Sequence, residues 1–553
     1  MSMLGQKVKA IKAAFSSKQA FLAAIETKES AQGRLANRNP WTNEDLGISP
    51  KKDWTWGWWD YAAFWWSYGF STGVWTAGSS LVSLGMTSWQ AIICIFVSHL
   101  LGAIGMAMHS RSSATYHFGF PIASRIPWGL RGGYFPVFVR VLVGTIWVGV
   151  QLVQGGYFVA VLFSAVFGEG FANMKNTSRI DNHPPSLERA YSEGSIALHY
   201  QKSVVLPPIV IGLFVFCMLQ ARDSGEAAGT FSQTGTLKGS ALAWAMLGGI
   251  NSVMGKTSTS IVNQPDLARY ARTQTAPTWS QLIALPIGNT LCATLGIFGT
   301  SAIRAGWGEA IWNPWDLCSA ILDRYGSGHA GARAGVAVVA LGFVFSILGS
   351  NLGANVIPWG ADTAVLFPRY INIRRGMYIS YVLGVAVCPW RILKSASSFL
   401  QFLGGYSIFL GPFVGIFLTD YLVCRRGNMY VADLYTPGGR YWYRHGAHWR
   451  AAVAYVVAVV LPIPGFAQTF GEPVPLAWLR IYQVGWLLTC TLSSVVYWLL
   501  CFVGDVAVDE KQMAFEAIAW EQLEPYIEPE TERIQGREPP VVEAVGVINE
   551  PKA

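Results

Sequence analysis

The chain alternates long apolar runs with short charged segments. A helix needs roughly 20 apolar residues to cross the hydrocarbon core of a bilayer. Runs of about this length, bounded by charge, each predict a membrane-spanning helix. Eleven such runs occur, at residues 59–84, 88–109, 135–166, 203–220, 239–263, 278–302, 334–358, 376–393, 399–422, 450–468 and 480–503.

One segment interrupts this alternation. Residues 168–202 are polar, contain Pro184 and Pro185, and include an N-x-S sequon at Asn176 that suits an outer loop. We predict no span there. This leaves the third and the next predicted spans joined by a segment that does not cross the membrane.

The distribution of positive charge conflicts with that count. Lys and Arg gather in cytoplasmic loops, and residues 1–53 hold nine Lys and Arg against five acids, so we expect the N-terminus in the cytoplasm. The basic loops should lie on the same side, which requires one more crossing between residues 167 and 203. Either a helix is missing or the polar segment re-enters the membrane. The basic loops carry Arg111, Arg125, Arg131 and Arg140, then Arg269 and Arg272, then Arg369, Arg374 and Arg375, and finally Arg425, Arg426, Arg440, Arg444 and Arg450.

Composition supports a lipid environment and excludes several classes of protein. Only 13% of the residues are charged and 52% are apolar, whereas a soluble chain carries about 25% charge. The net charge of +8 follows from the basic loops and requires no nucleic acid. The eight Cys residues show no paired spacing and no CxxC, which argues against a disulfide scaffold or a zinc site. We predict no metal and no cofactor.

The chain divides into a cytoplasmic tail (1–53), a transmembrane domain (54–504) and a second tail (505–553). The second tail carries twelve acids and four bases and has few large apolar residues, which predicts disorder. Lys511, Lys552 and the N-terminal lysines are candidate sites for ubiquitin ligase machinery that would direct turnover. An inert, solvated tail is the alternative.

Polar clusters inside apolar runs are candidate functional positions, because polar groups in hydrocarbon usually face a cavity or another helix. The first is SYGFSTG, from Ser67 to Gly73, where the helix could unwind or pack through small residues. The second is Trp147 with Gln151, which are four residues apart and share a helix face. A ring plane beside an amide suits a flat heterocyclic amide. Gln151 could equally form an interhelical bond.

Two further clusters lie in later runs. Lys256 occupies the middle of a run, in a near miss to a phosphate loop that has Ile250 where glycine is required. A broken helix that lines a cavity is the better interpretation. Asn351 and Asn355 share a face that can bind an imide or ureide, or can hold helices together. Ser346 and Ser350 lie on neighbouring turns.

A set of motifs in a fixed order gives this chain a family resemblance. They are NRNPWTNEDLGISP, GMTSWQA, RIPWGLRGGYFPVFVR, W-x-x-x-Q, NQPDLARYA, GSNLGANVIP and GPFVGIFLTDYLVCRRG. Over about residues 38–504 the chain resembles the nucleobase-cation-symport-1 transporters, and within these the fungal uracil, allantoin and uridine permease branch. The resemblance implies an all-α polytopic membrane protein with the leucine-transporter-type five-plus-five inverted repeat, twelve helices, and breaks in helices 1 and 6.

The resemblance also implies roles for particular residues. Substrate would lie between helices 1, 3, 6, 8 and 10, where Trp147 stacks on its ring, Gln151 bonds its amide and Asn355 pairs with its polar edge. Lys256 and Thr257 would occupy the break in helix 6. Asn351 and Ser71 complete the expected set, with Ser71 standing where bacterial relatives place a glutamine.

Two accessory sites follow from the same resemblance. The cation site of sodium-coupled relatives corresponds to Ser67, Phe70, Ser346, Gly349 and Ser350. Gly349 replaces a hydroxyl, which disfavours sodium, and resemblance to the fungal branch implies protons as the coupling ion. A gate on helix 10 would comprise Phe402, Leu403 and Tyr406.

The family has a fourth helix where this chain has the polar segment, in agreement with the conflict found from charge. A mistaken translation or a genuine eleven-span variant would each explain it. We expect a plasma-membrane, proton-coupled symporter that takes up uracil or a related solute by alternating access, and no enzyme activity. A non-transporting receptor on the same scaffold, or a thiamine or nucleoside permease, is the alternative. The sequence does not decide the oligomeric state. It also does not decide which substrate is carried: uracil, allantoin, uridine, thiamine or uric acid.

Overall fold

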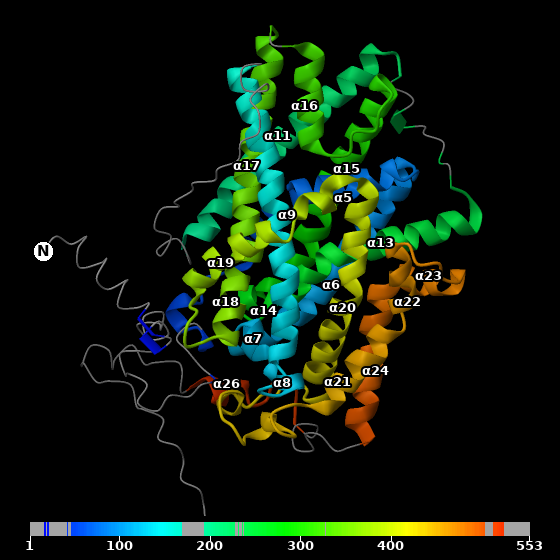
Figure 1. The fold of residues 1–553 in the computed structure, drawn as a ribbon. Helices are drawn as coiled ribbons and strands as arrows, with labels where there is room; N and C mark the ends of the chain where they lie inside the picture. Colours follow the sequence, from blue (N-terminus) through cyan, green and yellow to red (C-terminus); the bar gives the residue numbers. More distant parts are fainter. Residues whose placement is uncertain are drawn as a thin grey trace, which may run out of the picture.

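The computed structural model of the chain is an all-helical bundle (Figure 1). It describes residues 16–17, 19–20, 41, 46–168, 193–226, 230–231, 235, 237–326, 328–503 and 513–524. The longer helices are α4 (Trp58–Gly69), α5 (Thr72–Ser83), α6 (Ser88–Tyr116), α9 (Tyr134–Phe167), α11 (Glu193–Asp223), α13 (Gly239–Val262), α15 (Ala276–Trp307), α16 (Pro314–Tyr325), α17 (Ala330–Asn351), α18 (Ile357–Leu366), α19 (Ile373–Ala386), α20 (Ala396–Leu418), α21 (Trp449–Val460), α23 (Leu476–Gln483) and α24 (Gly485–Val503).

Short helical segments connect or extend these helices. Two are π-helical turns that continue α17 and α20, η3 (Leu352–Val356) and η5 (Thr419–Cys424). The others are η2 (Lys51–Asp53), α7 (Phe120–Ala123), α8 (Arg125–Trp128), α14 (Gln264–Ala268), η4 (Pro389–Lys394), η6 (Ala432–Leu434), η7 (Arg440–Trp442), α22 (Ile463–Ala467), η8 (Gln468–Phe470) and α26 (Ala519–Leu523).

Seven helices of the described chain are long and apolar enough to cross a membrane, and an eighth span is formed if the pair 449–460 and 463–470, bent by 50°, is counted as one. The eleven predicted runs all fall on helices. The count is smaller because the first run is two twelve-residue helices, α19 has 14 residues, and α13 contains several polar residues. The chain is therefore a multi-pass membrane protein.

Local sequence fixes where several of these helices begin. Thr87 accepts a hydrogen bond from the backbone N–H of Gln90, and the Gln90 side chain accepts one from the Thr87 N–H, which is the capping box that starts α6. Asn372 and Ser395 accept bonds from the third residue of α19 and α20 in the same way. The polar residue before each apolar run thus sets the start of the span.

The helices α9 and α11 run in the same direction. The Arg333 guanidinium at the start of α17 donates to the carbonyl of Ala165 at the end of α9, at 2.8 Å. Lys202, in the first third of α11, donates to Ser350 at the end of α17 at 2.8 Å. Because α17 is antiparallel to both, the chain leaves α9 at one end of the bundle and enters α11 toward the other.

The parallel course of α9 and α11 leaves unresolved the conflict between the number of predicted spans and the distribution of positive charge. No helix lies between α9 and α11 within the described chain, and residues 169–192 are outside it. The predicted boundary of the polar segment is wrong, however, because residues 193–202 are helical and begin α11. The sequon at Asn176 and the two prolines also fall outside the described residues.

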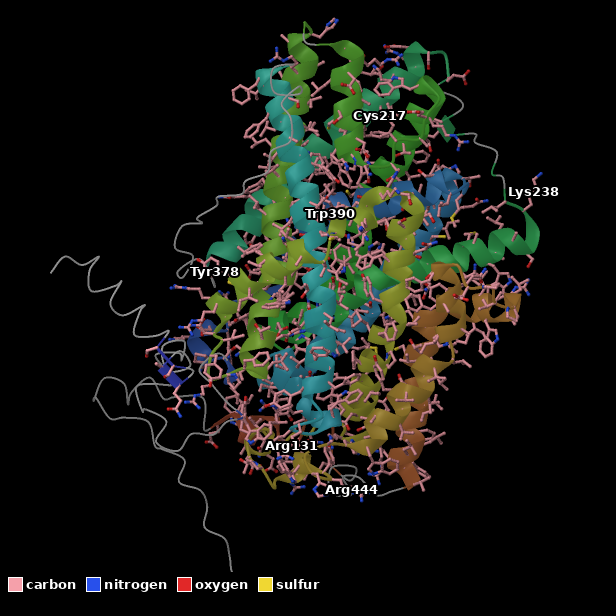
Figure 2. The ribbon with its side chains drawn as sticks, in the orientation of Figure 1. Arg131, Cys217, Lys238, Tyr378, Trp390 and Arg444 are labelled. Carbon is pink, nitrogen blue, oxygen red and sulfur yellow. The ribbon has the colours of Figure 1, made fainter. Side chains whose placement is uncertain are left out.

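The basic loops gather at one end of the bundle, as their charge predicts. Arg131 and Arg444 lie together there, opposite Cys217 (Figure 2). The Arg131 backbone N–H donates to the Gly446 carbonyl at 2.8 Å, which joins the two loops directly. We call this the basic end.

A buried ion-pair network holds three helices together near the basic end. Arg140 of α9 is 7% exposed, and its Nε donates to Asp362 of α18 at 2.6 Å. Its other nitrogens pair with Asp362 and with Asp266 of α14, and its guanidinium lies 4.2 Å from the ring centroid of Phe120. Every charged group in this network thus has a partner of opposite sign, as burial requires, and the single guanidinium serves two carboxylates.

The segment before α4 also packs at the basic end. The Trp54 ring stacks on His117 with centroids 3.5 Å apart, and Ser49 accepts a bond from Arg269 Nε at 2.6 Å. Burial, followed by the nearby Arg269 charge, lowers the pKa of His117 to about 4, against the opposing effect of its bond to the Arg269 carbonyl.

Part of the C-terminal tail is ordered, which corrects the prediction of disorder throughout 505–553. Residues 513–524 pack against the bundle and include α26. The Glu516 carboxylate, 8% exposed, binds Arg111 of α6 at 2.6 Å and accepts from the Tyr421 hydroxyl of η5 at 2.6 Å. Lys511 and Lys552 lie outside the described residues.

Candidate functional site

The first helix of the bundle is broken near its middle, as the sequence predicts. The helix α4 ends at Gly69, Phe70 and Ser71 leave the helical path, and α5 begins at Thr72. A side chain at Gly69 would meet the backbone of Gly288 in α15 at 2.7 Å. Glycine is therefore required where the two backbones approach before the break.

The break opens onto a small buried cavity of about 10 Å³. Five residues predicted for the site line it: Ser71, Trp147, Gln151, Lys256 and Ser350. Tyr68, Thr72, Gly73 and Ile347 complete the wall. The cavity thus gathers α4, α5, α9, α13 and α17, whose contributing residues are far apart in the sequence.

Two polar atoms in this wall have no hydrogen-bond partner among the described residues. They are the Gln151 side-chain oxygen and the Lys256 ammonium, and both atoms are buried. Lys256 lies 5.3 Å from the ring centroid of Tyr68. An unsatisfied buried polar group costs about 1–3 kcal/mol, so a hydrogen-bonding partner for either atom would be favourable.

Trp147 forms the link between the cavity and the predicted gate. Its indole N–H donates to the Tyr406 hydroxyl of α20 at 3.1 Å, and its ring lies 5.9 Å from that of Phe402. Leu403, the third residue predicted for the gate, is buried, and its backbone carbonyl packs closely against Gly255 of α13. The structure therefore brings two of the three gate residues against the stacking residue.

The two asparagines of the fourth cluster bond to each other. Asn355 Nδ2 donates to Asn351 Oδ1 at 3.0 Å across the π-helical turn η3, and Asn351 Nδ2 donates to the Val148 carbonyl of α9 at 3.4 Å. Asn351 is thus held in the bundle. Asn355 lines an adjoining cavity with Trp147 and Asp362, on the side of the basic end.

Two expectations about the helix that corresponds to helix 6 of the family are wrong. The helix α13 is continuous from Gly239 to Val262, with no break at Lys256. Thr257 does not face the cavity: its hydroxyl donates to the Val253 carbonyl one turn back, and its methyl group fills the space left by Gly102 of α6. A Ser or Thr hydroxyl that donates to a carbonyl one turn back in its own helix satisfies its hydrogen-bonding need, so the helix can stay intact.

The region predicted for a cation is filled by side chains. Ser346 donates to the Phe70 carbonyl at 3.1 Å, and Ser67 contacts His199 Nδ1 at 2.7 Å. Ser350 accepts from the Lys202 ammonium at 2.8 Å, and Lys202 is fully buried. Gly349 is also buried, and its backbone position offers no hydroxyl.

His199 and Lys202 are not among the residues that the sequence pattern predicts for the site. They are three residues apart, so they occupy one face of α11. The signal was available, since HYQK directly precedes an apolar run. The predicted run begins at residue 203, which leaves both residues outside the predicted span.

A wider cavity opens at the basic end. It has a volume of about 470 Å³ and is lined by groups that include Asp53, Asp266, Arg269 and Arg374. Tyr68 lines both this cavity and the small buried one. One aromatic side chain therefore lies between the buried cavity and the wide cavity.

Comparison with known proteins establishes the family. The sequence profile described as permease for cytosine/purines, uracil, thiamine, allantoin matches residues 49–184 and 197–489. The chain belongs to this permease family. The permease is a transporter and not an enzyme, and the gap in its match, residues 185–196, falls within the polar segment 168–202.

Named relatives and solved structures agree with this assignment. The permease is 30% identical to the uridine permease of Saccharomyces cerevisiae over 88% of this chain and 79% of that one. It is 29% identical to the allantoin permease of the same yeast, with the same coverage. Its fold matches Mhp1, a nucleobase-cation-symport-1 family transporter, solved in a closed conformation with bromovinylhydantoin bound: the TM-score is 0.65 at 18% identity, over 87% of this chain and all of Mhp1. The fold is thus of the leucine-transporter type.

Proposed function

We propose that the permease takes up a nucleobase or allantoin-like solute by proton symport, with the buried cavity as its single substrate site. The observation that carries the proposal is the pair of unpartnered polar atoms beside Trp147, the acceptor of Gln151 and the donor of Lys256. An imide or ureide offers an N–H next to a carbonyl, so one such solute would satisfy both atoms. The names of the relatives, a uridine and an allantoin permease, support the same class.

Proton coupling is supported by the contents of the predicted cation region. The Lys202 ammonium donates to Ser350 there, so a covalently held positive charge lies where a sodium ion would otherwise bind. A lysine can lose its proton on one side of the membrane and regain it on the other, which couples protonation to the conformational cycle. Lys202 bonds Ser350 of α17 directly, and His199, one turn earlier on α11, contacts Ser67 of the first helix.

Alternating access would open the buried cavity on one side of Trp147 while the other side stays closed, and then the reverse. The wide cavity leads from the basic end to Tyr68, while Phe402 and Tyr406 pack against Trp147. We propose that the basic end is cytoplasmic, that the structure resembles a state facing that side, and that the permease works in the plasma membrane. A receptor on the same scaffold would bind solute without accumulating it.

Uptake measurements test this function. Radiolabelled uracil, allantoin and urate are offered to cells that lack their own carriers and express the full chain. We expect accumulation that falls when external pH rises or a protonophore is added, and that is unchanged when choline replaces sodium. Sodium dependence without pH dependence would refute proton coupling, and binding without accumulation would identify a receptor.

Lys202→Gln isolates the coupling role. We expect this variant to exchange internal for external solute but to lose uphill accumulation, because the hydrogen bond to Ser350 can form without a titrating group. Lys238→Gln, at the exposed start of α13 (Figure 2), is the matched control and should accumulate solute normally. Normal accumulation by Lys202→Gln would show that the proton binds elsewhere.

A further inference from the structure

The buried cavity has an unbalanced electrostatic character. Lys256 is 5% exposed and its ammonium has no hydrogen-bond partner within the described chain. Lys202 approaches the same wall through Ser350. No carboxylate is among the residues that line the cavity in the described part of the chain. Both nearby full charges are therefore positive.

The start of α5 adds to this positive potential. The backbone N–H groups of Val74 and Trp75 both turn back to the Ser71 carbonyl, and the Ser71 side chain makes no capping bond. The N–H groups of Thr72 and Gly73 precede the first helical bonds, and this end of a helix carries a partial positive charge. Ser71, Thr72 and Gly73 all line the cavity.

Lys256 is aimed at this helix terminus. A Cβ built on Gly73 would lie 3.6 Å from the Lys256 ammonium nitrogen. An ammonium beside a helix N-terminus repels it, so the arrangement is unfavourable until a negative charge lies between them. The twelve residues of α5 are enough to give its terminus a substantial dipole.

We propose that the site selects solutes that carry a delocalised negative charge, namely heterocyclic imides or ureides that are mono-anions at neutral pH and keep one N–H. Their anionic edge lies between the Lys256 ammonium and the first N–H groups of α5. Their remaining N–H donates to Gln151, and their ring stacks on Trp147. This inference rests on the proposed function, since it specifies the solute of the same cavity.

Isothermal titration calorimetry of the purified full chain tests the charge preference with two probes of one ring size. Barbituric acid is a mono-anion at neutral pH and uracil is neutral. A hydrogen bond to a charged partner contributes more binding free energy than a neutral one, and the difference corresponds to about a tenfold change in affinity. We therefore expect barbituric acid to bind at least about tenfold more tightly than uracil.

Variants separate charge from hydrogen bonding. Lys256→Gln should remove the preference for barbituric acid, and Lys256→Arg should keep it. Lys238→Gln, on the same helix but exposed, should leave both affinities unchanged. Gly73→Ala places a methyl group at an ordinary contact distance from the ammonium and is compatible with a helix, so it should weaken barbituric acid several-fold more than uracil.

Each outcome decides the proposal. Uracil binding as tightly as barbituric acid, or a preference that survives Lys256→Gln, would overturn anion selection and leave the proposed transport function standing. Binding of neither probe nor of any other nucleobase or ureide would overturn both. If Lys256→Gln does not elute as a folded species in gel filtration, Gly73→Ala decides, and an equal effect of that variant on both probes would refute the proposal.

Discussion

Each polar residue near the cavity is distinguished by whether it already has a partner. Gln151 and Lys256 keep a free polar atom, whereas Asn351 bonds the backbone of α9 and Thr257 bonds its own helix. Sequence position alone does not separate these cases, because all four lie in apolar runs. We therefore expect the strongest effects of substitution at the first two.

Gln151→Ala should weaken solute binding by about one to two orders of magnitude, because a solute N–H left without an acceptor costs roughly 1–3 kcal/mol. Asn355→Ala should have a smaller effect, since Asn355 already bonds Asn351. The measurement is competition for labelled-solute uptake, with surface expression checked. Gln220→Ala, at the far end of α11, is the matched control. Unchanged affinity in Gln151→Ala would remove that residue from the site.

At the scale of helices, the charge network of Arg140 joins α9, α14 and α18 in a buried setting. Arg140→Met leaves the buried Asp362 carboxylate without its cation, which is expected to cost about 3–5 kcal/mol, and also removes a partner of the partly exposed Asp266. The midpoint of thermal unfolding in detergent should fall by several degrees. Arg222→Met removes an exposed ion pair with Asp223 and should change the unfolding midpoint very little. Equal effects of the two variants would mean that the network adds no stability.

The contact of the N-terminal segment with His117 should depend on pH. The pKa of His117 is lowered to about 4, below its ordinary value of 6.5, so the fold favours the neutral ring. Its stabilising contribution is complete above about pH 6.5 and is lost as pH falls toward 4. We expect proteolysis before α4 to accelerate over this range.

His117→Gln should reduce that pH response, because the replacement does not titrate. His445→Gln, in an exposed loop at the same end, serves as the control and should show the same acceleration of proteolysis at low pH as the unchanged protein. A response that is the same in all three proteins would assign it to another group.

For the whole molecule, the sequence predicts most of the architecture and part of the site. Apolar length and charge place the spans, and Gly69 with its polar neighbours predicts the first break. The break at Lys256 was wrongly predicted because polarity was taken for unwinding, while Thr257 and its neighbours bond within an intact helix. Lys202 was missed because only the fold shows that α11 begins early enough to bring it to Ser350.

The parallel course of α9 and α11 gives a prediction about the gene. The family profile, the charge pattern and the two helices all point to the same segment. Sequencing the transcript across codons 165–210 should reveal an apolar helix that the present translation lacks. If the transcript encodes the segment as written and uptake is normal, the topology deduced from charge must be revised. If uptake is absent, the chain is an eleven-span variant without transport.

The contact of Glu516 connects the tail to the transport cycle through thermodynamic linkage. Its carboxylate bridges Arg111 on α6 and Tyr421 on η5, two helices that come from different halves of the chain. Solute binding that moves these two helix ends would change the affinity of the bundle for the tail by some factor. Holding the tail in place would then change the affinity for solute by the same factor. A protein that captures the released tail would therefore act as an allosteric ligand of the cavity, and the occupancy of the cavity would in turn govern how often the tail can be captured.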